Sequence, residues 1–176
     1  MKKENIWLII SILLVIIWMV SVFKLSSEVS EVSGNRSSGF ISSIIRFFYN
    51  DISEDNLEKL TESLQPFVRK IAHFLLYSLG GFLIYNLIYI ILRKYGYIKN
   101  IIISILCGVF YAITDEIHQL FVPGRSGEIR DVFIDTLGVI FGTLMYYLII
   151  SFLVKRIFNK KSKIMSTNTN KNTNDI

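Results

Sequence analysis

Cysteine, histidine and the common catalytic motifs are scarce in this sequence of 176 residues. The single cysteine, Cys107, excludes an internal disulfide framework and a cysteine-based metal cluster. The two histidines do not recur at a ligand spacing on one expected helix, so we expect no metal ion and no cofactor. A serine-nucleophile motif, a phosphate-cradling glycine loop and an internal repeat are also absent from the sequence.

Long apolar runs make up most of the chain. Hydrophobic residues account for 52% of the sequence, the mean hydropathy is +0.48, and the runs are unbroken rather than periodic. The net charge of +5 comes from basic residues that flank these runs, which indicates membrane orientation rather than nucleic-acid binding. The sequence therefore predicts an all-α, polytopic membrane protein surrounded by membrane lipids, and no nucleic-acid partner.

The apolar runs define one membrane domain over residues 1–154. Its four expected spans lie at residues 6–23, 67–92, 101–122 and 131–154. The loop at 24–66 is expected to hold one or two short interfacial helices, the second ended or restarted by Pro66. The segment 155–176 is basic and then rich in Asn, Thr and Lys, so we expect a disordered tail.

The first run is interpreted as a retained membrane anchor. The alternative is a cleaved signal peptide, but the run is long for one and no Ala-x-Ala-like cleavage site follows it. Basic residues are denser at the N-terminus, in the 93–100 link and in the tail than in the 24–66 loop, which also holds seven acids. The positive-inside rule then predicts that both termini are cytoplasmic and that the loop and the 123–130 turn lie outside.

Ionisable and polar residues near the outer ends of three spans form the predicted site. They are Lys70, His73 and Tyr77 on the second span, Asp115, Glu116 and Gln119 on the third, Asp131 and Asp135 on the fourth, and Arg125 in the turn; Gly138 and Gly142 continue the stripe of the two aspartates. Each set shares one face of its helix, and the glycines form a G-x-x-x-G that allows a close helix approach. Because ionisable groups are costly in a membrane, we expect these faces to meet in one pocket.

The residue types leave three functions open. In the first, Lys70 and Arg125 bind an anionic envelope component, such as a lipid-linked phosphate or a cell-wall precursor. In the second, Asp115 or Glu116 acts as a general base with His73 as its acid–base partner, in an intramembrane enzyme. A proton or ion pathway ranks last, because the inner halves of the spans are apolar. If a metal were bound, a hard cation held by the acids would fit better than zinc.

Three motifs occur in order along the chain. They are Lys70-x-x-His73-Phe74-x-x-Tyr77, Asp115-Glu116-x-x-Gln119-x-Phe121-x-Pro123-Gly124-Arg125 and Asp131-x-x-x-Asp135-x-x-Gly138-x-x-x-Gly142. With the pair Ser26-Ser27 after the first span, they resemble the VanZ-like family over residues 6–154, although many relatives have Asn where this chain has Asp135. The resemblance implies a multi-pass protein of the bacterial plasma membrane, and the name-giving member is linked to resistance to the lipoglycopeptide teicoplanin. Neither the residues nor the resemblance specifies an oligomeric state.

Overall fold

The computed structural model describes residues 3–92, 94–125 and 127–174, and these residues form five helices and no strands. In order, the helices are α1 (Lys3–Ser26), α2 (Ser30–Phe48), α3 (Glu54–Ile91), α4 (Tyr97–Gln119) and α5 (Ile129–Asn174). Within the described residues, α1, α3, α4 and α5 are long and apolar enough to cross a membrane. The all-α, polytopic fold predicted from the apolar runs is therefore confirmed.

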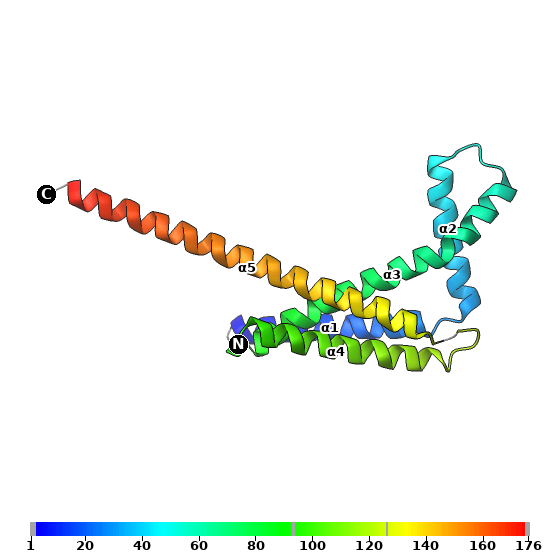
Figure 1. Ribbon diagram of the computed structural model, residues 1–176, viewed down its shortest axis with the longest axis horizontal. Helices are drawn as coiled ribbons and strands as arrows, with labels where there is room; N and C mark the ends of the chain where they lie inside the picture. Colours follow the sequence, from blue (N-terminus) through cyan, green and yellow to red (C-terminus); the bar gives the residue numbers. More distant parts are fainter. Residues whose placement is uncertain (1–2, 93, 126, 175–176) are drawn as a thin grey trace.

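The four long helices lie side by side as a bundle, and α2 stands at one end of it (Figure 1). α3 packs most extensively against α5, and it also contacts α4 and α1. Tyr77, Ala112 and Val139 are fully buried at the centre, and Trp18 of α1 packs against this cluster. Most other large apolar side chains face outward, as expected for a bundle that is solvated by lipid.

Glycines bring α3 and α5 into backbone contact. A Cβ atom at Gly138 would lie 2.5 Å from the carbonyl oxygen of Phe74, and one at Gly142 would lie 2.7 Å from the carbonyl carbon of Ser78. Neither position has room for a side chain, so the G-x-x-x-G of α5 lies against α3 as its spacing predicts.

α2 and the first turns of α3 form an antiparallel hairpin beyond the bundle (Figure 1). Its small core consists of Ile41, Ile45 and Leu57. Near the bundle, Gln65 Nε2 donates to the Gly34 carbonyl oxygen over 2.9 Å. The hairpin therefore has its own apolar contacts and its own hydrogen bonds, in addition to its continuity with the bundle.

Three helix boundaries differ from the predictions. α2 begins at Ser30, earlier than the apolar residues of the loop suggest. Pro66 lies inside α3, so the predicted break there is wrong; proline removes one amide hydrogen, and packing on both sides of it keeps the helix continuous. α5 continues as helix to Asn174, beyond the end of the fourth span expected at residue 154, and the segment 155–174 contains no Pro or Gly to end it.

Candidate functional site

Buried polar side chains from α3, α4 and α5 meet in the half of the bundle that faces α2. The group consists of Tyr77 from α3, Asp115, Glu116 and Gln119 from α4, and Asp135 from α5, and none is more than 5% exposed. The α4 members share a face because positions i, i+1 and i+4 of a helix lie within about 100° of each other. Three buried carboxylates in an apolar bundle are costly, so their contacts decide what this site can do.

Gln119 joins the two acids of α4. Its Nε2 donates to Asp115 Oδ2 over 3.3 Å and to Glu116 Oε1 over 3.1 Å. Tyr77 Oη donates to the same Asp115 oxygen from α3 over 3.1 Å. The backbone N–H of Glu128 donates to Glu116 Oε2 over 3.0 Å. Both acids of α4 are thus oriented by donors from other parts of the chain as well as by their own helix.

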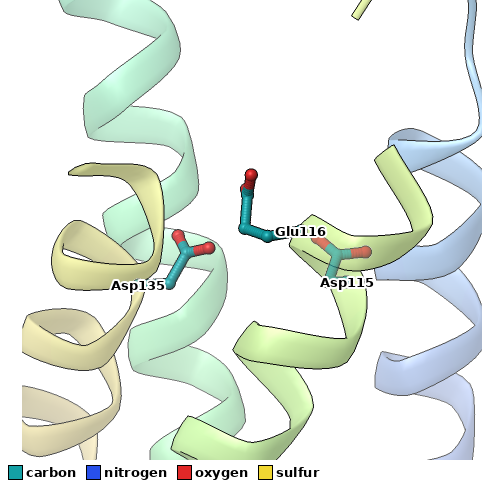
Figure 2. Close-up of side chains that lie close together, drawn as sticks. All are labelled: Asp115, Glu116 and Asp135. Carbon is teal, nitrogen blue, oxygen red and sulfur yellow. The ribbon is translucent and has the colours of Figure 1, made fainter. Parts of the chain in front are cut away.

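Asp135 lies opposite these acids without a hydrogen-bond donor. Its side chain has no exposed surface, and neither carboxylate oxygen has a hydrogen-bond partner among the described residues. His73 Nδ1 lies 3.4 Å from Asp135 Oδ1, which is an ion pair when the imidazole is protonated, although the geometry does not make a hydrogen bond. Figure 2 shows Asp135 reaching from α5 towards Asp115 and Glu116, and one oxygen of each acid lies within 4.8 Å of the others.

Arg125 ties the turn after α4 to the end of α1. Its Nε donates to the Glu28 carbonyl oxygen over 2.9 Å, and its Nη2 donates to the Leu25 carbonyl oxygen over 3.0 Å. Its Nη1 lies 3.4 Å from Gln119 Oε1 and donates to it. Burial lowers the pKa of the Arg125 guanidinium, but a guanidinium remains charged at any physiological pH. Arg125 therefore links the buried acids to the carboxyl end of α1, where a cation is favourable.

A polar chamber of about 390 Å³ lies between α2, α3 and the start of α5. Its charged lining residues are Arg69, Lys70, Arg125 and Arg130, with the acids Glu128 and Asp131. His73 also lines it. The cations outnumber the acids in this lining, so the fixed charge around the polar chamber is net positive.

An apolar chamber of about 450 Å³ adjoins it. Its apolar walls are formed by Val22, Leu25, Phe40, Val68, Ala72 and Leu76, and Tyr77 and Asp115 also line it. Both chambers are lined by Ser33, Ser37, Arg69, His73 and Arg125. The two spaces therefore meet along a shared wall, which combines a cationic part and an apolar part in one site.

The family model described as VanZ/LLP1 matches residues 11–151. The chain belongs to the VanZ/LLP1 family. The match covers every buried acid of the site and confirms the resemblance carried by the three motifs. Neither the curated proteins nor the solved structures contain a match to this chain.

In this VanZ/LLP1 protein, the residues predicted for the site occupy two neighbouring regions. Tyr77, Asp115, Glu116, Gln119 and Asp135 form the buried cluster, with Asp115 also lining the apolar chamber. Lys70, Asp131 and Arg125 line the polar chamber, and His73 lies between the two regions. Lys70 is exposed and lines the polar chamber, away from the buried acids.

Three residues that line the chambers of this VanZ/LLP1 protein were not predicted from the sequence: Arg69, Glu128 and Arg130. Arg69 lines both chambers, and its only signal in the sequence is its place beside Lys70 at the start of an apolar run. Glu128 and Arg130 line the polar chamber with an ion pair of 3.6 Å. His118 lies outside the site, because its Nε2 is 2.9 Å from Ser27 Oγ at the end of α1.

Proposed function

We propose that this VanZ/LLP1 protein binds an anionic amphiphile of the cell envelope, such as a lipid-linked phosphate. The charged head group would occupy the polar chamber and the hydrocarbon chain would occupy the apolar chamber. The observation that supports this proposal is the shared lining, because Arg69 and His73 border both spaces and a ligand that occupied both would contact these two residues. The volumes of the two chambers also fall in the range of about 300–1,000 Å³ that is usual for ligand sites.

The head group is assigned to Arg69 and Lys70. Arginine offers a planar fork that matches phosphate or carboxylate oxygens, and lysine adds a compact positive charge. Arg125 is given a different role from the one expected from the sequence, because its donors bind Leu25, Glu28 and Gln119. It supports the wall between the chambers and contributes positive charge to both.

We place the site at the outer face of a bacterial plasma membrane, with both termini in the cytoplasm. The support is the distribution of basic residues, which are densest at the N-terminus, in the 93–100 link and in the tail. Lipoglycopeptides act at this face, so we expect that producing the chain in a sensitive bacterium changes its susceptibility to teicoplanin.

Binding is tested with the full chain in detergent micelles and a long-chain polyprenyl phosphate as the probe. We expect Lys70→Gln and Arg69→Gln each to weaken binding at least about tenfold, because each removes a charge-assisted hydrogen bond. Lys99→Gln is the matched control, since Lys99 is an exposed cation at the start of α4 and lines neither chamber. Equal binding of the neutral prenol, or wild-type affinity in both chamber variants, would refute the proposal.

The proposed position of the hydrocarbon chain is tested separately with Ala72→Phe, because the larger side chain fills part of the apolar chamber. This variant is expected to lose affinity for the long-chain phosphate while a short-chain alkyl phosphate binds as it does to the wild type. A parallel loss for both ligands would show that the apolar chamber is not where the hydrocarbon chain lies.

A reaction on the bound lipid is the second candidate function. It is favoured by Asp115, a buried carboxylate that lines the apolar chamber and is oriented by Tyr77 and Gln119. If Asp115 acts as a general base, Asp115→Asn retains lipid binding but abolishes product formation from lipid-linked intermediates in membranes. Unchanged product formation in that variant would exclude this role.

A further inference from the structure

We propose that Asp115, Glu116 and Asp135 bind one hard divalent cation, such as Mg²⁺, Mn²⁺ or Ca²⁺. This inference goes beyond lipid binding and does not depend on it. One oxygen from each acid lies within 4.8 Å of the others. Three oxygens at most 4.8 Å apart can all lie within about 2.8 Å of one point, so movements of a few tenths of an ångström bring them to the roughly 2.3–2.6 Å of Ca²⁺ ligands, and slightly larger ones to the distances of the smaller Mg²⁺ and Mn²⁺.

The environment of the Asp135 side chain is a second, independent observation that points to a ligand. Its carboxylate is fully buried and faces Asp115 and Glu116 (Figure 2). Both of its oxygens lack a hydrogen-bond partner among the described residues. A buried carboxylate is stable only when its charge is matched, and the 3.4 Å ion pair with His73 involves Oδ1 alone, which leaves Oδ2 without a partner among the described residues. A cation between the three acids would supply the missing partner.

The surrounding contacts resemble the outer shell of a metal site. Tyr77 and Gln119 donate to Asp115 Oδ2, and Gln119 and the Glu128 backbone donate to Glu116. Hydrogen bonds of this kind orient coordinating carboxylates and leave lone pairs for an ion. The three proposed ligands are all oxygen donors, which selects hard cations over zinc or copper.

The test uses Mn²⁺ as the probe and follows free Mn²⁺ by electron paramagnetic resonance. The full chain is purified in detergent with a chelator, freed of the chelator, and titrated without added lipid. We expect saturable binding of one ion per chain that Mg²⁺ or Ca²⁺ displaces. Asp135→Asn and Glu116→Gln are each expected to weaken it at least about tenfold. Glu58→Gln is the matched control, because Glu58 is an exposed acid of the α2–α3 hairpin.

A second measurement keeps the proposal testable if a variant folds poorly. Mn²⁺ is expected to raise the thermal midpoint of the wild type and of Glu58→Gln, and to raise that of Asp135→Asn by clearly less, because the ion stabilises the folded chain in proportion to the logarithm of its affinity. The absence of saturable binding by the wild type, or an equal Mn²⁺ shift in Asp135→Asn, would overturn the proposal. Neither result bears on lipid binding, which is measured separately.

Discussion

Replacing Gly142 with alanine is expected to separate α3 from α5. An added Cβ atom would lie 2.7 Å from the carbonyl carbon of Ser78, 2.9 Å from the backbone nitrogen of Phe82, and closer still to the Ser78 oxygen. All three atoms belong to the α3 backbone, so no side-chain rotation relieves the overlap. Restoring a separation of about 3.5 Å from all three atoms requires the two helices to move apart by roughly 1 to 2 Å.

The size of the effect follows from two opposing terms. Overpacking costs up to about 3 kcal/mol, and the upper figure applies to Gly142→Ala because the clash is with backbone. Alanine is the better helix former by about 1 kcal/mol, which leaves a net loss of about 2 kcal/mol. For a chain of this length, that loss lowers the thermal midpoint by about 4–8 °C. The site is affected too, because Asp135 lies two turns earlier on α5 and would move relative to α4.

The assay is thermal unfolding of the purified chain in one detergent, with Gly39→Ala as the control. Gly39 lies in α2, and a Cβ atom there would have nothing within 4 Å, so alanine should leave stability unchanged or raise it by up to about 1 kcal/mol. If Gly142→Ala matches Gly39→Ala in midpoint, the backbones of α3 and α5 are not in contact at this position and the reasoning fails.

Two further predictions concern the polar contacts. Tyr77→Phe removes the hydroxyl that donates to Asp115 and should lower the free energy of unfolding by about 1 kcal/mol, as measured by unfolding in mixed micelles. Tyr85→Phe is the control and should leave the free energy of unfolding unchanged, because the buried hydroxyl of Tyr85 has no partner among the described residues. An equal loss of stability in both variants would argue against the contact between Tyr77 and Asp115. Arg125→Lys should destabilise the chain by about 2 kcal/mol, because one ammonium cannot replace three directed donors. Arg130→Lys is the control and should leave the free energy of unfolding unchanged, since the Arg130 side chain is 81% exposed. An equal free energy of unfolding for the two variants would contradict the role given to Arg125.

Features that depend on local spacing could be predicted from the sequence. Asp115, Glu116 and Gln119 share a face in any α-helix, and the spacing of Gly138 and Gly142 places them against a neighbouring helix. The apolar runs likewise predicted the four long helices, because crossing the hydrocarbon core fixes a minimum length.

Features that depend on contacts between distant residues could not be predicted. Arg125 lies about a hundred positions from the Leu25 and Glu28 carbonyls that it binds, and no local pattern encodes that pairing. The continuity of α3 through Pro66 has the same origin, since packing against α2 on one side and the bundle on the other outweighs a local helix-breaking preference. The assignment of Arg69 to the chambers also needs the position of α2, which the sequence does not specify.

The attachment of α2 has a consequence for how the proposed lipid ligand would enter. α2 supplies Ser33 and Ser37 to both chambers, yet it packs chiefly against α3. Pro66, which lacks one backbone hydrogen bond, lies where the hairpin joins the bundle. A swing of the hairpin about this point would widen both spaces in a single movement. A lipid could then slide in sideways from the leaflet, head and hydrocarbon chain together, without being threaded through a pore.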